Sequence, residues 1–569
     1  MTAPAGRRAA RRLPAAMLDY HVHVTGAFQT HAVDNQPPVR GPRDLYADDR
    51  PLREALQREG GDWARDEVQA YARLAGGELM DCGELANRHR PALRAVDAYG
   101  RRVDEVDFAP AYHRLMAAAI AHGVAGFAWR HEARAGAHVA RAALMYLHYQ
   151  ADAGSACPLT MTHACVPALR HAPALARDWL PRVLCADYDP SHRPAWDKAG
   201  NTIGMGMTEK QGGSDVRANS TRATPAGDGM VSLVGHKWFF SAPMSDAFLV
   251  LAQSADGLGC YLLPRFAPDG ARNRYRLQRL KDKLGDWSNA SSEVEFEGAL
   301  AWPVGDPGRG VATILEMVAL TRLDCQLGSA ALMRQALSQA IHHVRYRRAF
   351  GRGLAEQPLM RNVVADLALE SEAATALAFR VARALDAAPR DPAEAALARL
   401  ATALGKYWIC KRATPFVNEC QEALGGIGYV EDTMLPRLLR QAPLNSIWEG
   451  SGNIQCLDVL RALHKEPGCR DAYFAELEGA RGGHPLLDAE AAALRRLLDA
   501  APDELQAQSR WLAERMALAL QAAVLLRGGN AEVGSAFSEH RLGPRAGLAF
   551  GTLTPGAPVG SLLERAGLQ

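Results

Sequence analysis

The sequence predicts a mainly α-helical protein with a small β domain in the middle of the chain. Two observations carry this prediction. Apolar residues recur about every 3.6 residues in the first and last parts of the 569-residue chain, and short β-prone segments bounded by turn residues lie between them. Strands and helices do not alternate, which excludes a Rossmann layout. At roughly 150 residues per domain, the length suggests about three or four domains.

The chain is expected to begin with an irregular N-terminal arm, residues 1–48. The start of this arm is rich in arginine and lacks the apolar segment of a secretory signal. An N-terminal helical domain is expected over residues 49–199, because apolar side chains there repeat at helical spacing between Gly and Pro punctuation. Residues that show the repeat are Leu52, Ala55, Leu56, Tyr112, Leu115, Met116 and Ile120.

A change of period predicts the middle β domain, residues 200–303. Its strands are expected where short runs of β-branched, aromatic and aliphatic residues stand between turn signals. These runs are Met230–Val234, Phe248–Ala252, Cys260–Leu263 and Glu293–Phe296.

Helical periodicity returns at Gly308 and predicts a C-terminal helical bundle over residues 304–465. Apolar stripes run from Asn362 to Leu385 and from Leu397 to Leu424, and a bundle buries such stripes. Residues 466–569 are expected to form a helical C-terminal extension that ends in a Gly- and Pro-rich tail after Gly543.

The amino-acid composition indicates the cellular compartment that we expect for the protein. Apolar residues make up 48% of the chain, and no run approaches the roughly 20 apolar residues that a membrane span needs, so no membrane partner is expected. The ten cysteines are scattered, with no C-x-x-C pair and no Cys/His cluster at zinc spacing. We therefore expect a protein of the reducing cytoplasm without a metal site.

The net charge of +2 is distributed unevenly. From Glu466 to the end, 10 Lys and Arg stand against 13 Asp and Glu, so the extension carries −3 and the rest of the chain +5. The segment Arg265–Lys283 holds seven cations against Asp269 and Asp282. Such a segment is either a solvated face or a footprint for a polyanion, and the sequence leaves both interpretations open.

The glycine-rich stretch Gly204–Asp215 is the strongest local signal for a ligand. Four glycines bring bare backbone close to a ligand, and Thr208, Ser214 and Asp215 add short polar groups. It matches neither the P-loop nor the G-x-G-x-x-G pattern. A cofactor loop is favoured over a structural turn, and the residues alone do not choose the ligand.

This stretch resembles the Thr-Glu-Pro-x-x-Gly-Ser-Asp loop of the acyl-CoA dehydrogenase flavoproteins, with Lys210 in place of the proline. The resemblance covers residues 50 to 465 and implies an N-terminal helical domain, a middle β-barrel and a C-terminal helical bundle. It also implies that the loop binds FAD. The residues to which it assigns this role are Met205, Met207, Thr208, Gly213 and Ser214.

The segment His236–Ser241 resembles the next flavin-binding strand of that family. The resemblance places Phe239 beside the flavin ring and the hydroxyl of Ser241 near its N5 atom, where Trp and Thr are common in relatives. Without the resemblance, Trp238-Phe239-Phe240 is equally well interpreted as part of a core strand.

Two segments of the bundle resemble the parts of the family that reach the adenine half of FAD in a neighbouring subunit. One contains Arg347 and Phe350, and the other contains Gln421, Gly425 and Gly426. The resemblance thus implies a homo-oligomer, a tetramer in this family. Taken singly, the first segment also fits an exposed helix end and the second a glycine helix cap.

The segment Ile447–Gln455 resembles the family's Glu-Gly-Thr loop. Glu449 stands at the place of the catalytic base, and burial beside Trp448 would raise its pKa toward working pH. An exposed loop glutamate is the alternative. The other flavin contacts that the resemblance implies here are Trp448, Gly450, Ser451 and Asn453.

Within the family, the chain most closely resembles the AidB-like branch of the bacterial adaptive response to DNA alkylation. The resemblance implies affinity for double-stranded DNA and at most weak dehydrogenase activity. Arg437, Arg440 and Arg461 are the expected DNA contacts. Trp287 departs from the arginine of many relatives, and an acidic extension would need a local basic face to bind phosphates.

Three hypotheses follow. The first is an FAD-binding, DNA-binding flavoprotein of the alkylation response. The second is a metabolic acyl-CoA dehydrogenase that oxidises a branched or unusual acyl-CoA at Cα–Cβ. The third is a flavin-bearing scaffold without turnover.

Overall fold

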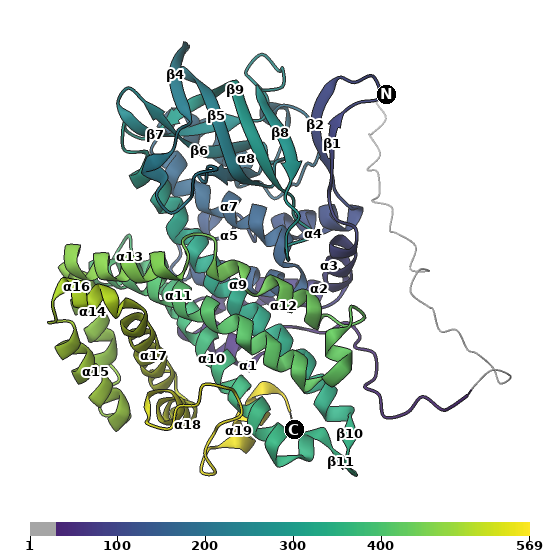
Figure 1. Cartoon of the computed structure of the whole chain (residues 1–569), viewed down its shortest axis with the longest axis vertical. Coiled ribbons are helices and arrows are strands. Elements are labelled where there is room, and N and C mark those ends of the chain that lie inside the picture. Colours follow the sequence, from purple (N-terminus) through teal and green to yellow (C-terminus); the bar gives the residue numbers. More distant parts are fainter. Residues whose placement is uncertain (1–29, 569) are drawn as a thin grey trace, which may run out of the picture.

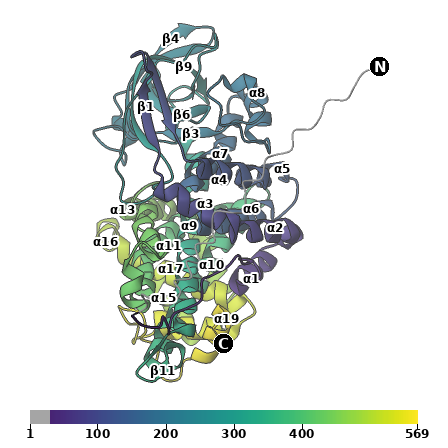
Figure 2. The ribbon, with the colours of Figure 1, turned by 90° about the vertical axis from the view of Figure 1, so that its right-hand side faces the viewer.

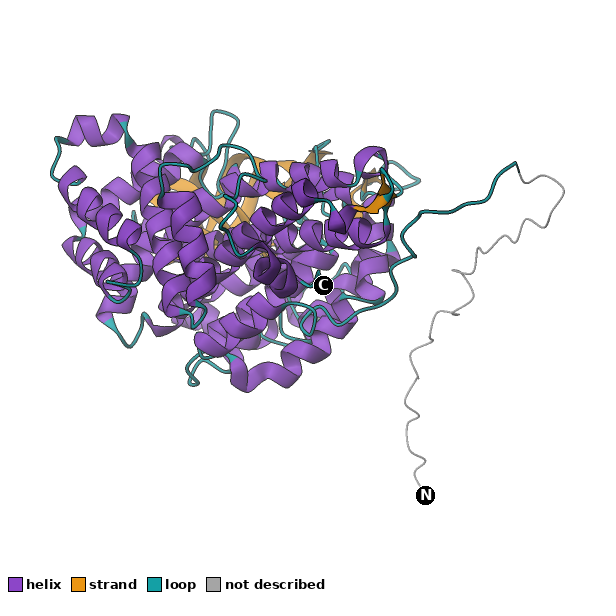
Figure 3. Ribbon diagram, turned by 90° about the horizontal axis from the view of Figure 1, so that it is seen from below, coloured by secondary structure: helices purple, strands orange, loops and turns teal. Residues whose placement is uncertain are grey.

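The computed structural model describes residues 30–568, and the predicted fold class is confirmed. Figure 1 shows a β domain at one end of the molecule, layers of helices below it, and a further helical group beside the bundle. Figure 2 shows the same order of layers from the side, and in Figure 3 the strands lie behind the helices. The first 29 residues of the expected N-terminal arm lie outside the described residues.

The N-terminal helices form where the sequence predicts helical periodicity. They are α1 (Arg50–Arg58), α2 (Arg65–Ala75), α3 (Glu78–Arg88), α4 (Pro110–Ala121), α5 (Phe127–Arg130), α6 (Ala137–Ala151), α7 (Ala153–Arg170) and α8 (Pro173–Val183). The side chain of Asp49 accepts a hydrogen bond from Leu52 N and so caps the start of α1. The predicted stripe of Leu52, Ala55 and Leu56 is buried.

A β-hairpin, not predicted from the sequence, interrupts these helices. Its strands are β1 (Ala92–Val96) and β2 (Arg102–Asp107), which pair antiparallel. Both strands are short and rich in charged residues, so they lack the β-prone composition that predicts strands elsewhere. The hairpin extends from the helical domain and lies beside β8 (Tyr275–Leu280) (Figure 1).

The middle of the chain forms one seven-stranded sheet that closes on itself. Its other strands are β3 (Ile203–Gly206), β4 (Arg222–Gly227), β5 (Met230–Ser241), β6 (Ala247–Ser254), β7 (Gly257–Pro264) and β9 (Ser291–Val304). The pairings run β6–β4–β5–β9–β7 and back to β6, with β3 beside β6 and β8 beside β9. All four predicted strand segments lie inside β5, β6, β7 and β9. The expectation of a barrel is met by this ring of pairings.

The C-terminal bundle is built around one long helix, α9 (Gly310–Tyr346). It packs against α6 and α7 of the N-terminal domain and against two further long helices. The other elements are β10 (Arg348–Ala349), β11 (Arg352–Gly353), α10 (Pro358–Ala387), α11 (Pro392–Ala423), α12 (Leu435–Gln441) and α13 (Gly452–Lys465). The apolar stripes predicted for α10 and α11 are buried in the main core.

The C-terminal extension packs against α10 and α11. It contains α14 (Pro467–Glu478), α15 (Pro485–Leu497), α16 (Pro502–Ala507), α17 (Ser509–Arg527), α18 (Ala531–Phe537) and α19 (Val559–Ala566). The last helix lies in the Gly- and Pro-rich tail after Gly543. It forms because Leu562, Leu563 and Ala566 give it an apolar face, which packs on the bundle.

Two arginines of the extension are used inside the protein. Arg541 Nε donates to Glu370 at 2.8 Å, and Arg565 Nε donates to Glu372 at 3.1 Å. Both carboxylates belong to α10. These cations fasten the extension to the bundle and are not available to an external polyanion.

Among the described residues, no helix is long and apolar enough to cross a membrane. In the same part of the chain, no group of three or more His, Cys, Asp and Glu side chains could hold a metal ion.

Candidate functional site

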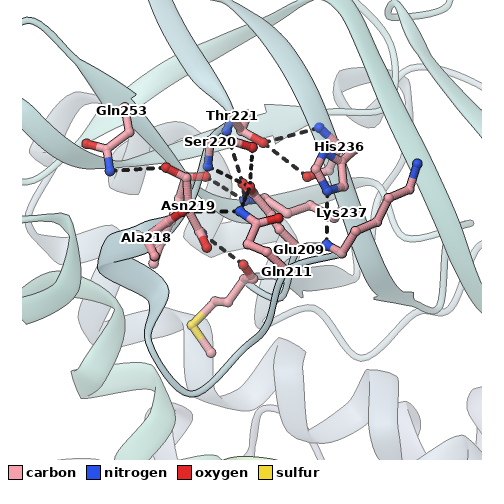
Figure 4. Close-up of polar contacts among 12 residues, drawn as sticks. Glu209, Gln211, Ala218, Asn219, Ser220, Thr221, His236, Lys237 and Gln253 are labelled. Atoms are coloured by element: carbon pink, nitrogen blue, oxygen red, sulfur yellow. Dashed lines mark hydrogen bonds and ion pairs between the residues drawn. The ribbon is translucent and has the colours of Figure 1, made fainter.

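A buried ion pair fixes the glycine-rich loop to the sheet. Glu209 and Lys237 have fully buried side chains, and the Lys237 ammonium lies 2.8 Å from the Glu209 carboxylate (Figure 4). Ser220 N and Thr221 N also donate to Glu209, at 2.6 and 3.2 Å, while Lys237 Nζ donates to Leu251 O at 2.8 Å. Burial acts to raise the pKa of Glu209, but the Lys237 cation and these donors hold it well below its usual range.

Backbone contacts set the path of the same loop. Trp238 N donates to Thr208 O at 2.8 Å, and Asn219 Nδ2 donates to Met207 O at 3.0 Å. A Cβ atom on Gly213 would lie 2.5 Å from Thr208 Oγ1, so only glycine lets the loop fold back on Thr208. Gly213 and Ser214 are exposed to solvent.

The end of β5 presents one aromatic ring outward and one inward. Phe239 is 49% exposed, whereas Phe240 is buried in the barrel. The Lys281 ammonium lies 4.7 Å from the Phe239 ring, and Ser241 Oγ lies 3.1 Å from Ser291 Oγ. The core-strand interpretation therefore holds for Phe240, while Phe239 offers an accessible flat face.

Two cationic side chains fix the backbone of the loop that carries Glu449. Glu449 has a left-handed backbone, with φ of 58°, and Gly450 follows with φ of 92°. Lys406 Nζ donates to Trp448 O at 2.6 Å and to Gly450 O, while Arg322 Nε donates to Glu449 O at 3.0 Å. A non-glycine residue in this conformation persists only where its surroundings fix it, as these cations do.

The side chain of Glu449 is half-buried and hydrogen-bonded to one hydroxyl. Thr321 Oγ1 donates to Glu449 Oε2 at 2.9 Å. Burial raises the pKa of Glu449, and the Thr321 hydrogen bond and the cations of Arg322 and Lys406 oppose this effect only in part. A carboxyl group with a raised pKa in a fixed position has the properties of a general base.

These parts meet where the three domains join. Trp448, Met205 and Met207 all pack against one buried cluster, which includes Cys157 of α7 and Met317 of α9. The fold thus brings together the glycine-rich loop, the end of β5 and the Glu449 loop, which are far apart in the sequence. Ser451 and Asn453 stand at the start of α13, exposed, and Arg510 Nε of the extension donates to Asn453 at 2.8 Å.

The other expected FAD contacts belong to two segments of the bundle. Arg347 Nη1 donates to Asn35 O at 2.7 Å, and Phe350 in the β10–β11 turn is 99% exposed. Figure 1 shows β10 and β11 at the end of the bundle far from the β domain. Gln421 Nε2 donates to Gly428 O at 2.8 Å and fixes the loop that contains Gly425 and Gly426.

One expected DNA contact, Arg437, is mostly covered by the protein. It donates to Ala151 O at 3.2 Å and lies 3.7 Å from Glu84. Arg440 is stacked 4.0 Å above the Trp287 ring and paired with Glu431.

Arg461 is exposed and lines a cleft of about 480 Å³ between the β domain, α9 and α13. Arg217 and Arg309 line the same cleft, which the sequence interpretation missed. Arg217 follows the glycine-rich loop by two residues and Arg309 directly precedes α9, so a search for cations at the edges of the loop and the helix would have found them.

Comparison with known proteins gives three adjoining family matches. The adaptive response protein AidB N-terminal domain matches residues 35–190, the acyl-CoA dehydrogenase middle domain matches 204–299, and the acyl-CoA dehydrogenase C-terminal domain matches 308–464. AidB of Escherichia coli (strain K12) is 53% identical over 457 residues, which cover 79% of this chain and 84% of AidB.

Solved structures show the same fold. The Caenorhabditis elegans protein ACDH-11, in complex with C11-CoA, superposes with a TM-score of 0.82 at 28% identity and covers 90% of this chain and 94% of its own. Glutaryl-CoA dehydrogenase from Mycobacterium smegmatis, in complex with FADH2, gives a TM-score of 0.58 at 19% identity over 74% of this chain and 99% of its own, a likeness of fold alone.

Proposed function

The chain belongs to the acyl-CoA dehydrogenase family, and within it to the AidB branch, and on this premise we propose that it binds FAD where its three domains meet. Members of this family are flavoproteins. The observation that carries the proposal is that the glycine-rich loop, the end of β5 and the Glu449 loop meet at one buried cluster. A flat cofactor needs an apolar face, a polar edge and backbone donors, and these elements supply all three.

Each element has a distinct task in this proposal. Thr208 and Ser214, on the loop fixed by Glu209, hold the polar edge and the diphosphate. Phe239 covers one face of the ring, and Ser241 donates a hydroxyl near its reactive nitrogen. When bound, the flavin would act as the acceptor of a hydride from a carbon atom. Among the remaining expected contacts, Met205, Met207 and Trp448 form the apolar wall.

The proposed cofactor site is completed by a second copy of the chain. Arg347 and Phe350 flank β10, which lies at the end of the bundle far from the β domain (Figure 1), so we infer that they do not share a ligand with the Glu449 loop of the same chain. Exposed apolar side chains gather in this segment and in the one that contains Gln421 and Gly425. They are Tyr346, Phe350, Leu359, Ile427 and Tyr429. Such side chains favour a protein interface, and a homotetramer would cover them.

A biological role in the response to DNA alkylation, through binding of double-stranded DNA, is proposed from the relation to AidB. Two of the expected cations remain at the surface, Arg440 in part and Arg461 fully. The ten cysteines are all free thiols, which supports a cytoplasmic location. Duplex binding of this kind depends on phosphate contacts and should weaken steeply with salt and little with base sequence.

Acyl-CoA oxidation is the second candidate, and the cleft of Arg217, Arg309 and Arg461 favours it. Three guanidinium groups line this cleft, one of them on α13, the helix that follows the Glu449 loop, and they suit the phosphates of coenzyme A. In this reaction Glu449 would remove the α-proton of the thioester, and a bound flavin would supply the acceptor for the hydride from the β-carbon. The relative ACDH-11 has been seen with C11-CoA.

One anaerobic experiment tests the cofactor and separates the candidates. The flavin-loaded protein is titrated with isovaleryl-CoA and with C11-CoA while its visible spectrum is recorded, and duplex binding is then measured at several salt concentrations. Bleaching at turnover rates supports the dehydrogenase. Salt-dependent duplex binding with slow bleaching supports the AidB-type role. A stable flavin that shows neither response supports the third hypothesis, a flavin-bearing scaffold without turnover.

A further inference from the structure

A second cluster of cations lies outside the proposed flavin site. We name it the arginine cleft, a hollow of about 420 Å³ between β2 and β8. Five arginines line it: Arg102, Arg265, Arg272, Arg274 and Arg276. Only two carboxylates, Asp104 and Glu297, line it with them, so the lining carries an excess of three positive charges.

A tight turn between β7 and β8 builds this cleft. Ala267 N donates to Ala271 O at 2.8 Å, which closes the turn and sets Arg265 beside Arg272. The buried side chain of Asn273 then fixes the chain on both sides. Its Nδ2 donates to Pro264 O and Leu300 O at 2.8 Å, and its Oδ1 accepts from Leu300 N at 2.9 Å. The arginines therefore project from a rigid base.

Three of the arginines have a carboxylate partner. Arg276 pairs with Glu297 at 2.6 Å, and Arg102 pairs with Asp104 at 2.8 Å. Arg272 lies 3.2 Å from Glu105, which also pairs with Arg94 and with His192. Because this one carboxylate serves two guanidinium groups and a histidine, the positive charge around Arg272 is only partly balanced.

The other two arginines, Arg265 and Arg274, have no carboxylate partner among residues 30–568. Arg265 is 5% exposed, and its Nε has no hydrogen-bond partner there. Its terminal nitrogens contact only neutral acceptors, Met244 Sδ and Ser191 O, each at 3.4 Å. A buried cation without a counter-ion is costly, and an anion in the cleft would remove that cost.

From this arrangement we infer that the arginine cleft binds phosphate groups, with Arg265 at its floor and Arg272 and Arg274 at its rim. Guanidinium groups bind phosphate oxygens through paired hydrogen bonds, and several around one hollow suit a diphosphate or two successive phosphates of a nucleic acid backbone. The inference goes beyond the proposed flavin function. It also assigns a ligand to the cation-rich segment Arg265–Lys283, for which the sequence left two interpretations open.

The test uses the full-length, flavin-loaded protein. Calorimetric titration measures binding of inorganic pyrophosphate, and fluorescence anisotropy measures binding of a labelled duplex of unrelated sequence at low salt. The loss variant is Arg272→Gln combined with Arg274→Gln. The matched control is Arg222→Gln, an exposed arginine on β4 away from the cleft. Glu297→Gln is the gain variant, because it frees Arg276 from its partner.

We expect the loss variant to weaken pyrophosphate binding at least about tenfold and the gain variant to strengthen it, with the control unchanged. If duplex binding falls in parallel and its salt slope decreases by about one per lost contact, the phosphates belong to DNA. If only pyrophosphate binding falls, the ligand is a free phosphate compound. Unchanged pyrophosphate binding in both the loss and the gain variant would overturn the inference. The visible spectrum, recorded in parallel, reports separately on the flavin site.

Discussion

The Lys237 ammonium lies 2.8 Å from the Glu209 carboxylate, and neither side chain is exposed to solvent. Lys237 belongs to β5, two residues before Phe239, while Glu209 directly follows Thr208 in the glycine-rich loop. One ion pair thus fixes the relative position of two elements to which we assign flavin contacts. A buried pair of this kind adds little net stability but strongly specifies geometry when its partners are satisfied.

Removal of one member of this pair should strongly destabilise the fold. Lys237→Met leaves a buried, unpaired carboxylate, and we expect the free energy of unfolding to fall by about 3–5 kcal/mol, with loss of bound flavin. Urea unfolding and the visible spectrum measure the two effects. Lys210→Met is the control, because Lys210 is exposed on the same loop and its contact with Glu295 at 3.6 Å should contribute less than about 1 kcal/mol. Equal stability of the two variants would contradict the assignment.

Glu449→Gln tests the proposed base. We expect flavin binding to persist and bleaching by acyl-CoA to slow by about 10²–10⁴-fold, since the amide cannot accept the α-proton. Stopped-flow absorbance measures the rate. Glu431→Gln, at an exposed glutamate, should bleach at the rate of the unmodified protein. Bleaching of the Glu449→Gln protein at an undiminished rate would exclude this residue as the base.

The raised pKa of Glu449 makes a second, pH-dependent prediction. The proposed base acts only when ionised, so the bleaching rate should rise with pH through a pKa above the ordinary value of 4.5. The same raised pKa makes the stability of the fold decrease with pH, whereas the bleaching rate increases with pH. Because the folded state favours the protonated form, the stabilisation is complete below the unfolded pKa and is lost as pH rises through the folded pKa. Thermal unfolding from pH 4 to 8 should show this loss, and Glu449→Gln should lack it.

Arg541→Ala tests how the extension is fastened to the bundle. Burial acts to raise the pKa of Glu370, but Arg412 and Arg541 lower it to about 2. The ionised form of Glu370 therefore stabilises the fold above the ordinary pKa of 4.5, and this stabilisation is lost as pH falls from there toward 2. Without Arg541, we expect the free energy of unfolding at neutral pH to fall by about 3–5 kcal/mol.

Urea unfolding at pH 7 and pH 4 measures this loss. Arg545→Ala is the matched control, because Arg545 is exposed in the same extension. If Arg541→Ala were no less stable than Arg545→Ala at neutral pH, the proposed fastening would be wrong.

Much of the fold could be predicted because its long elements have regular patterns. The stripes of α10 and α11 have a helical period, and the predicted segments of β5, β6, β7 and β9 have a β-prone composition between turn residues. The β1–β2 hairpin escaped prediction because its residues are charged and its strands gain their partners from the turn between them and from β8. Helix α19 was not predicted because a Gly- and Pro-rich segment precedes it. Its formation is explained by its packing on α10 and α1.

The candidate site was predictable by resemblance and not by periodicity. Nothing in the local sequence says that Lys237 is buried, because its partner Glu209 lies 28 residues away. Likewise, Arg437 and Arg461 are both cations near the Glu449 loop in the sequence. Only the tertiary structure separates the first, which is buried, from the second, which lines a cleft.

The central claim is that a flavin lies between the Thr208 loop, Phe239 and the Glu449 loop. The most direct measurement is the visible spectrum of the purified protein, before and after incubation with FAD and removal of the unbound cofactor. We predict flavin absorbance in near-stoichiometric amount, retained in Glu449→Gln and lost in Lys237→Met. Folded protein that stays colourless after incubation with FAD would contradict the claim.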